Sequence, residues 1–213
     1  ICNELIKQGK FVRGTVRSLK IISEISNYEC ISVGDIDSNT NWTKALSNCE
    51  CVIHCAAITH TIKVLDYNSS RTYQKVNVEA TKQLANDAVS AGVKRLIFLS
   101  SIKVNGENTD QWFKDQIEKK KNEKIFSHND IPAPEDNYAL SKLEAENVLL
   151  DISKKTGLEI VILRLPLVYG FGAKGNLARL QKIVRLGIPL PFKKIKNKRS
   201  LIGINNLIDL ISC

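Results

Sequence analysis

The sequence predicts an α/β fold, a doubly wound parallel sheet with helices on both faces. Short apolar runs alternate with amphipathic stretches, which is the pattern of strand–helix–strand units. Each apolar run is nearly continuous instead of alternating, as expected for strands that are covered on both faces. The predicted strands are Phe11–Val16, Glu29–Val33, Cys51–Ala56, Lys94–Ser100 and Leu158–Leu163.

Helices are predicted around these strands, and glycines mark where two of them end. Gly92 and Gly157 lie where a helix commonly stops in a left-handed residue. The first nine residues also predict a helix, because Ile1, Leu5 and Ile6 share one helical face. The predicted helices are Ile1–Gly9, Thr43–Leu46, Arg71–Ala91, Tyr138–Thr156 and, later in the chain, Leu177–Leu186.

The first predicted element of the chain is not the one with which a doubly wound domain usually begins. In the common strand order the first strand is central, and the Gly-rich turn after it holds a pyrophosphate. Here a helix comes first and the sequence contains no Met, so we expect that strand and turn to precede Ile1. We expect a partial sheet domain over 1–165 and, over 166–213, the start of a smaller Gly- and Pro-rich unit that continues past Cys213. Asp110–Lys124 reads as a solvated insertion.

Composition places the chain among ordinary globular proteins. The 31 Lys and Arg residues exceed the 22 Asp and Glu residues, which gives a formal net charge of +9 and suits an anionic ligand. No apolar run approaches the roughly 18 residues that span a bilayer, and no secretory signal is evident. We therefore expect a cytoplasmic protein without membrane insertion. Its six Cys residues are expected to be reduced thiols, and no metal site is predicted.

Two basic runs could be taken for nucleic-acid contacts. They are Lys119–Lys124 and Lys193–Arg199. Neither is interleaved with aromatic residues, and the chain shows no recognised nucleic-acid motif. We therefore expect no nucleic-acid partner.

A tyrosine, a lysine and a serine pair form the candidate chemistry. Tyr138 and Lys142 stand four residues apart at the start of a predicted helix, so their side chains share one face. A phenol is a poor base at neutral pH, but a nearby ammonium favours the phenolate. Ser100 and Ser101 end a predicted strand, where doubly wound domains place ligand-binding residues. Each element alone is common, whereas their order along the chain is far more restrictive.

Six stretches of the chain together match one known family. They are Cys51–Ala57, Val76–Thr81, Leu96–Gly106, Tyr138–Lys142, Leu163–Gly170 and Arg199–Ile202. As a set they resemble the extended short-chain dehydrogenase/reductase superfamily, and within it the NAD-dependent epimerase/dehydratase family that acts on nucleotide sugars. The resemblance implies a Rossmann domain with a bound nicotinamide dinucleotide. It also implies a smaller C-terminal domain that holds the nucleoside diphosphate of the substrate.

The resemblance implies a role for each matching residue. Tyr138 is expected to be the acid/base on the sugar hydroxyl, with Ser101 as its hydrogen-bonding partner. Lys142 is expected to bind the nicotinamide ribose and to lower the pKa of Tyr138. The other implied cofactor positions are Arg17, Asp35, Ile36, Ala56, Ala57, Asn77, Ser100 and Pro166. The other implied substrate positions are Lys103, Tyr169, Asn176, Leu177 and Arg199.

The residues after Ser101 bear on the reaction. Dehydratases of this family usually carry Asp-Glu directly after the catalytic hydroxyl, whereas this chain has Ile102 and Lys103. We therefore expect an NAD-dependent 4-epimerase, similar to those of UDP-glucose and UDP-N-acetylglucosamine, that acts by transient oxidation at C4. An NADPH-dependent 4-ketoreductase of a UDP-4-keto-6-deoxy-hexosamine stays open. Its basis is Arg17, which stands where NAD-preferring members usually have an acid and would suit the ribose phosphate of NADP.

Two further expectations concern activity and assembly. A non-catalytic NAD(P)-binding module is a third hypothesis, and the retention of Ser101, Tyr138 and Lys142 argues against it. Because the phosphate-binding glycine motif is absent, the isolated fragment is expected to be inactive. The resemblance implies a homodimer through the helices at 71–91 and 138–156.

Overall fold

The computed structural model describes residues 1–19, 26–59, 69–109, 125–170, 176–187 and 198–213. The chain forms two compact units, Cys2–Arg164 and Leu165–Cys213, and Ile1 belongs with the second. The expected insertion at 110–124 and the basic residues 193–197 lie outside the described residues. None of the helices in the described residues is both long enough and apolar enough to cross a bilayer.

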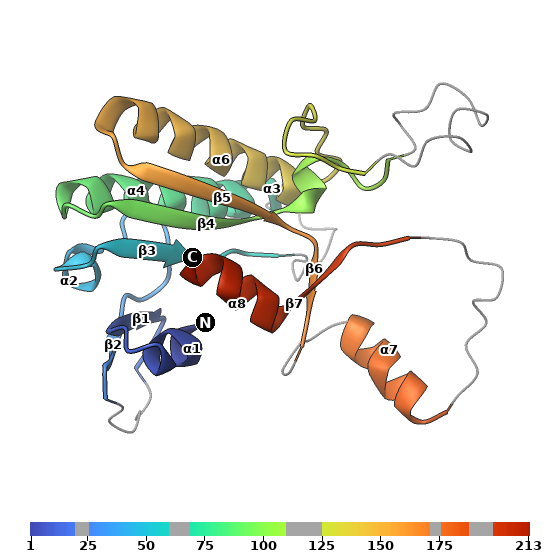
Figure 1. Cartoon of the computed structure of the whole chain (residues 1–213). Helices are drawn as coiled ribbons and strands as arrows, with labels where there is room; N and C mark the ends of the chain where they lie inside the picture. Colours follow the sequence, from blue (N-terminus) through green and yellow to red (C-terminus); the bar gives the residue numbers. More distant parts are fainter. Residues whose placement is uncertain (20–25, 60–68, 110–124, 171–175, 188–197) are drawn as a thin grey trace. The chain divides into compact units, whose positions relative to one another are not determined.

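The first unit is built on parallel strands (Figure 1). β1 (Val12–Val16) pairs with β2 (Tyr28–Ser32), and the two run in parallel. A second sheet has the order β3-β4-β5, formed by β3 (Cys51–His54), β4 (Arg95–Ser101) and β5 (Glu159–Leu165). β3 and β4 are again parallel. The predicted α/β fold with parallel strands is confirmed.

Helices connect the strands of this unit. α4 and α6 lie side by side along the sheet of β3, β4 and β5 (Figure 1). One stretch before α4, η1, has π-helical geometry, which often marks functional sites. The helices are α1 (Cys2–Lys7), α2 (Thr43–Leu46), α3 (Ser69–Tyr73), η1 (Gln74–Glu79), α4 (Ala80–Ser90), the 3-10 turn η2 (Ile102–Val104) and α6 (Asn137–Thr156).

The core of the first unit lies between the sheet and these helices. Leu96 and Phe98 of β4 are fully buried and pack with Leu84 of α4 and Leu149 of α6. Ile97 points to the other face of the sheet and is also buried. β4 is thus covered on both faces, which explains why its sequence is a continuous apolar run.

Helix α6 carries the candidate tyrosine and lysine, and its ends are fixed by capping residues. The Asp136 carboxylate accepts a hydrogen bond from Ala139 N at 2.7 Å, which satisfies one of the free donors of the first turn. Gly157 ends the helix with φ +77°, a left-handed conformation that glycine adopts without strain. Tyr138 therefore sits in the first turn of a well-defined helix.

The second unit contains a small parallel pair of strands. β6 (Leu167–Tyr169) pairs with β7 (Leu201–Gly203). Gly170 follows β6 with φ +148°, and a Cβ on it would collide with the Ile204 side chain. The helices of this unit are α7 (Asn176–Arg185) and α8 (Ile204–Ser212).

The structure departs from the predicted elements in three places. β3 ends at His54, whereas the predicted strand continued through Cys55 and Ala56. The helix predicted at Arg71–Ala91 is divided by the π-helical stretch η1. The short strands β6 and β7 and the helix α8 were not predicted, since three-residue strands carry almost no periodicity. The apolar spacing of Leu207, Ile208 and Ile211 would have indicated α8.

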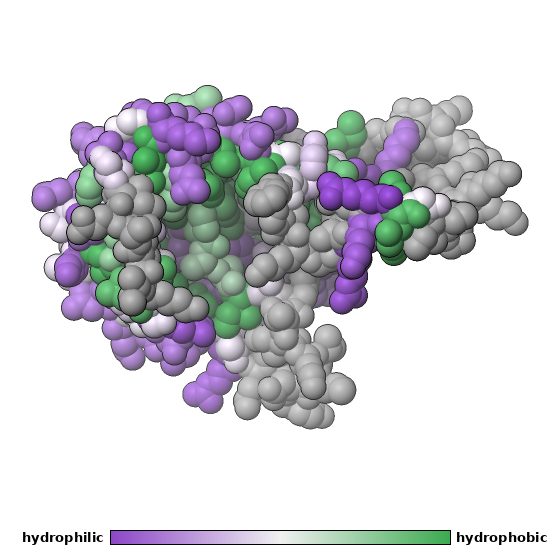
Figure 2. Space-filling view, turned by 90° about the horizontal axis from the view of Figure 1, so that it is seen from below, coloured by the Kyte–Doolittle hydropathy of each residue, from purple (hydrophilic) through white to green (hydrophobic). Residues whose placement is uncertain are grey.

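The surface accords with the composition. On the face shown in Figure 2, hydrophilic side chains predominate and apolar ones gather in places between them. Single exposed apolar side chains, such as Phe11 at 65% and Leu19 at 60% exposure, are ordinary on a folded domain.

Candidate active site

Ser101 and Tyr138 come from two elements that meet at the carboxyl end of the sheet. Ser101 is the last residue of β4, and its Oγ accepts a hydrogen bond from Lys103 N at 3.3 Å, which starts η2. Tyr138 lies in the first turn of α6, two residues after the cap Asp136. The two side chains are hydrogen-bonded to each other. The structure therefore brings together two of the three predicted catalytic residues.

The surroundings of Tyr138 act in opposite directions on the pKa of its phenol. Burial raises the pKa of Tyr138 above its ordinary value, and the hydrogen bond with Ser101 lowers it in part. The Asp136 carboxylate raises the pKa of Tyr138 and the Lys103 ammonium lowers it. The ring of Tyr73 lies close by, 6.3 Å between ring centres at an angle of 58°. Lys103 thus acts electrostatically on the phenol, the role that the sequence analysis gave to Lys142.

Lys142 lies one helical turn after Tyr138 and is only 2% exposed. Its Nζ stands 4.0 Å from the centre of the Phe98 ring. Burial lowers the pKa of Lys142 to about 8, while the charges of Glu146 and Cys55 act to raise it. Among the described residues its ammonium makes no hydrogen bond or ion pair. Its three N–H donors therefore remain available for a ligand.

A buried polar network lies beneath this pair. The Glu146 carboxylate, 2% exposed, accepts hydrogen bonds from Arg164 of β5, at 2.7 Å from Nη2 and 3.1 Å from Nε. The hydroxyl of Ser100 also donates to Glu146. Arg164 continues to Asn105 Oδ1 at 3.2 Å, and Asn105 Nδ2 donates to Ser127 O at 2.9 Å. Ser100, predicted to touch the cofactor, thus uses its hydroxyl to join β4 to α6.

Asn77 joins the loop after β3 to helix α6. Its Oδ1 accepts from Ile58 N at 2.8 Å, and its Nδ2 donates to Ile58 O at 3.0 Å and to Ser141 Oγ at 3.0 Å. Asn77 is 1% exposed and lies in the π-helical stretch η1. Its amide therefore fixes the loop that contains Ala56 and Ala57, of which Ala56 is exposed and Ala57 partly buried.

The remaining predicted residues of the first unit are Arg17 after β1, Asp35 and Ile36 after β2, and Lys103 after β4. Arg17 follows β1, and its Nε stands 2.5 Å from Asp35 Oδ1. Both side chains are largely exposed, at 80% and 77%. Ile36 is partly buried against the core. Lys103 is bound by two carboxylates, Asp136 and Glu107.

The other predicted substrate and cofactor positions belong to the second unit. Tyr169 of β6 is 42% exposed, Pro166 precedes β6, and Arg199 is exposed just before β7. Asn176 and Leu177 open α7, and their side chains lie outside the described part. The structure shows where these residues lie within the second unit.

Several residues of the site were not predicted from sequence. They are Asp136, Glu146, Arg164, Asn105 and Tyr73. One signal was present for Glu146, which stands four residues after Lys142 and thus on the same helix face as Lys142 and Tyr138. Its partner Arg164 lies on another element, and spacing gives no indication of it.

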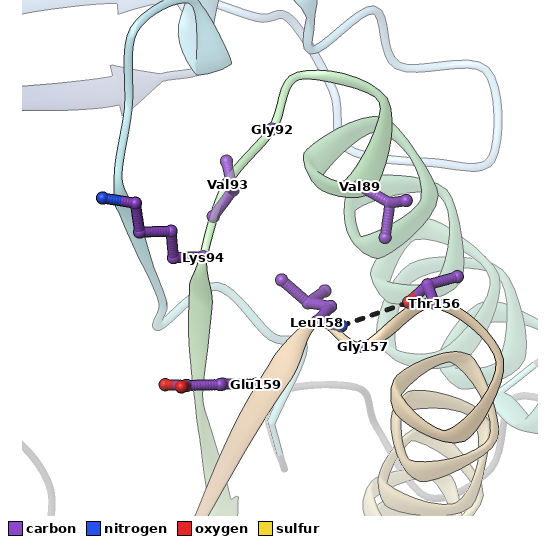
Figure 3. A pocket seen from close by; sticks show the side chains of 8 residues that line it. All are labelled: Val89, Gly92, Val93, Lys94, Thr156, Gly157, Leu158 and Glu159. Atoms are coloured by element: carbon purple, nitrogen blue, oxygen red, sulfur yellow. Dashed lines mark hydrogen bonds between the residues drawn. The ribbon is translucent and has the colours of Figure 1, made fainter.

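A hollow of about 430 Å³ lies at the opposite end of β4 and β5 from Ser101 (Figure 3). Within it Leu158 N donates to Thr156 Oγ1 at 3.3 Å. Open parallel sheets bind ligands beyond the carboxyl ends of their strands. This hollow lies at the amino ends, so we do not include it in the candidate site. Its lining residues are Val89, Gly92, Val93, Lys94, Thr156, Gly157, Leu158 and Glu159.

The chain thus has a Rossmann-like α/β fold, and its candidate site combines Ser101 of β4 with Tyr138 and Lys142 of α6. The family model of the NAD dependent epimerase/dehydratase family matches residues 1–212. The chain belongs to this family.

Relatives and solved structures agree with this membership. A UDP-glucose 4-epimerase of Vibrio cholerae is 46% identical over 180 residues, which are 84% of this chain and 52% of the relative. An Escherichia coli O157:H7 4-epimerase of N-acetyl-alpha-D-glucosaminyl-diphospho-ditrans,octacis-undecaprenol is 26% identical over 86% of this chain and 50% of its own. The solved UDP-glucuronic acid 4-epimerase of Bacillus cereus with NAD has a TM-score of 0.76 at 24% identity, over 97% of this chain and 66% of that one. The chain thus spans about half the length of these curated relatives.

Proposed function

We propose that the protein is an NAD-dependent 4-epimerase of UDP-glucose or UDP-N-acetylglucosamine, acting by transient oxidation at C4. The observation that carries the proposal is the hydrogen-bonded pair Ser101 and Tyr138 with Lys142 one turn away. The 46% identity to a UDP-glucose 4-epimerase supports the same reaction. The lysine at position 103, where dehydratases carry an acid, disfavours dehydration.

The residues of the first unit fit a nicotinamide dinucleotide. Lys142 is buried, and its ammonium has no hydrogen bond within the described residues, so ribose hydroxyls would give it polar partners. The small side chains of Ala56 and Ala57 would let a dinucleotide pass close to the backbone. A nicotinamide dinucleotide held by these residues would supply the hydride acceptor and donor for C4 of the sugar. Asp35 and Ile36 would flank its adenine.

The chemical steps on the substrate fall to Tyr138 and Ser101. The phenolate of Tyr138 takes the proton from the O4 hydroxyl as the C4–H bond breaks, which leaves a keto sugar. Ser101 Oγ, hydrogen-bonded to Tyr138, shares the O4 proton and holds the oxygen in place. The keto sugar then rotates in the site, so that the hydride returns to the opposite face of C4. Tyr138 returns the proton to O4, and C4 has the opposite configuration.

The second unit would bind the nucleoside diphosphate. Arg199 is exposed, and its guanidinium suits a pyrophosphate in both charge and geometry. We assign Asn176 and Leu177 to the binding of the same nucleoside diphosphate. Tyr169 and Pro166 are assigned to the segment that runs toward the sugar.

The second candidate is an NADPH-dependent 4-ketoreductase of a UDP-4-keto-6-deoxy-hexosamine. It requires the same tyrosine, serine and lysine but only the returning half of the reaction. The observation in its favour is Arg17, a cation at the end of β1 where a ribose phosphate would lie.

The proposal is tested on the full-length protein with UDP-glucose or UDP-N-acetylglucosamine and catalytic NAD⁺, with products resolved by proton NMR. The C4 epimer is expected, and Tyr138→Phe should abolish its formation. Without an epimer, stoichiometric oxidation of NADPH on a 4-keto-6-deoxy UDP-sugar would establish the reductase instead. A protein that does neither reaction would be a non-catalytic NAD(P)-binding module.

We further propose a homodimer through the helical stretches at 71–91 and 138–156, the second of which is α6. The two stretches pack on each other, and α6 exposes Leu140 at 43% and Leu150 at 42%. Exposed apolar side chains on α6 favour burial against a second copy. Analytical ultracentrifugation tests this. Leu150→Glu is expected to shift the species from dimer to monomer, and a monomeric wild type would overturn the proposal.

A further inference from the structure

Lys103 links the catalytic serine turn to the start of the catalytic helix. Its backbone N–H donates to Ser101 Oγ at 3.3 Å. Its Nζ stands 2.7 Å from Asp136 Oδ2, while Asp136 Oδ1 caps α6 by accepting from Ala139 N at 2.7 Å. Lys103, two residues after the end of β4, therefore connects Ser101 to Asp136, which stands two residues before Tyr138.

The ammonium of Lys103 is held in a cluster with two carboxylates. Glu107, one turn further along, forms the second ion pair with Lys103 Nζ. Glu107 N in turn donates to Glu135 Oε1 at 3.0 Å. Lys103 is 27% exposed, Asp136 34% and Glu107 35%, so the pairs are partly shielded from solvent. Burial opposes the charge of Lys103, but both carboxylates raise its pKa above the ordinary value.

This cluster acts on the tyrosines of the site. Lys103 lowers the pKa of Tyr138 and Asp136 raises it, against the larger effect of burial. The same two charges act on Tyr73, whose ring lies against that of Tyr138. Ser101 of β4 also acts on the Tyr138 phenol, and Lys142 follows one turn further along the same helix. Lys103 and Asp136 thus form an ion pair at the start of the helix that carries Tyr138, and their charges act on its phenol in opposite directions.

We propose that Lys103 is a positioning residue for the reaction: held by Asp136, it fixes the start of α6 against the Ser101 turn and supplies the positive charge that favours the Tyr138 phenolate. The inference rests on the proposed function, in which Tyr138 accepts the O4 proton. It gives Lys103 a role through Tyr138, whereas the family resemblance implied contact with the substrate.

The pKa of Tyr138 is expected to shift in opposite directions in two variants. Lys103→Met removes the cation, so the pKa of Tyr138 should rise. Asp136→Asn removes the anion but keeps a good helix cap, since Asn and Asp cap equally well, so the pKa of Tyr138 should fall. The rising limb of kcat/KM against pH should move by about half a pH unit in each direction, which is about a three-fold change in rate below the limb.

The titration of Tyr138 is also measured without turnover. Phenolate absorbance near 295 nm is followed with pH in the full-length protein, and the curve of the Tyr138→Phe variant is subtracted. Lys103→Met should shift the difference curve to higher pH, Asp136→Asn to lower pH, and Lys103→Arg should leave it unchanged. This readout does not depend on which sugar the enzyme accepts, so it can fail or succeed independently of the proposed function.

The possible results separate the roles of Lys103. Shifts of opposite sign in the two variants support the inference. An unchanged Tyr138 titration in Lys103→Met overturns it, and a raised KM with that unchanged titration would return Lys103 to substrate binding. A fall in kcat that is uniform across pH in both variants would show a structural role only.

Discussion

The guanidinium of Arg164 holds the buried carboxylate of Glu146, with 2.7 Å between Nη2 and Oε2. Ser100 donates to the same carboxylate, so one anion joins α6, β4 and β5 at the level of the candidate site. Glu146 is 2% exposed and Arg164 20%. A buried pair of this kind contributes little in total, but losing one partner leaves the other charge uncompensated.

We therefore expect Glu146→Gln to destabilise the protein by about 3 kcal/mol, because Arg164 would remain charged without a counter-ion. The free energy of unfolding in urea measures the effect. Asp151→Asn, an exposed carboxylate on the same helix, is the matched control and should change stability little. The double variant Glu146→Met/Arg164→Met should recover part of the loss. A Glu146→Gln variant as stable as wild type would contradict this account.

The second prediction concerns Lys142, whose pKa of about 8 lies below its ordinary value because the side chain is buried. In the unfolded chain the Lys142 side chain keeps its proton up to about pH 10.4. Between about pH 8 and pH 10.4 the unfolded state therefore holds more protons than the folded state, and the free energy of unfolding rises with pH. At neutral pH the buried charge costs about 3 kcal/mol.

Lys142→Met should accordingly stabilise the protein at pH 7 while it abolishes turnover. The gain should disappear as the pH approaches 10, which urea unfolding at both pH values measures. Lys154→Met removes an exposed lysine of the same helix and should show neither effect. Equal stability changes in the two variants would show that burial of Lys142 is not the cause.

Local patterns explain why the fold and the catalytic pair could be predicted. The strands are continuous apolar runs, and Tyr138 and Lys142 lie four apart on one helix, where spacing alone fixes their shared face. Arg164 and Glu146 are 18 residues apart on different elements, and only the folded chain brings them together. Asn77 was predicted from the resemblance, but that its amide binds Ile58 and Ser141 depends on tertiary structure.

The third prediction concerns acid stability and His54. This residue of β3 is buried, stacks on Phe98 with 5.8 Å between ring centres, and lies 3.0 Å from Thr81 Oγ1. Thr81 donates its own proton to Asn77 O at 2.8 Å, so His54 Nε2 carries a proton and donates to Thr81. Burial, and then the charge of Lys142, lower the pKa of His54 to about 3.

Because the unfolded histidine binds a proton below about pH 6.5, stability should fall as the pH drops from there toward 3. Between pH 6.5 and pH 5, His54 should lower the free energy of unfolding by about 2 kcal/mol. His54→Gln should remove this part of the slope, measured as the free energy of unfolding at several pH values. His128→Asn, at an exposed position, serves as the control. An unchanged slope in His54→Gln would place the acid sensitivity elsewhere.

The last prediction concerns the choice between NAD and NADP. Arg17, the cation proposed to meet a ribose phosphate, already pairs with Asp35 at 2.5 Å, and the carboxylate of Asp35 would repel that phosphate. Asp35→Asn should therefore raise the affinity for NADP relative to NAD, by about three-fold because the ion pair is exposed. Arg17→Ala should lower the affinity for NADP about ten-fold and leave that for NAD nearly unchanged.

Calorimetric titration of the full-length protein with each cofactor measures both ratios without turnover. Arg13→Lys, at a residue of β1 that is bonded to Glu29 and to the backbone oxygen of Ser47, is a control that leaves the Arg17 position intact. If neither variant changes the ratio, the ribose does not lie at Arg17, and the observation that favours the ketoreductase is lost. If wild type already binds NADP more tightly, Asp35 does not mask Arg17, and the reductase becomes the stronger candidate.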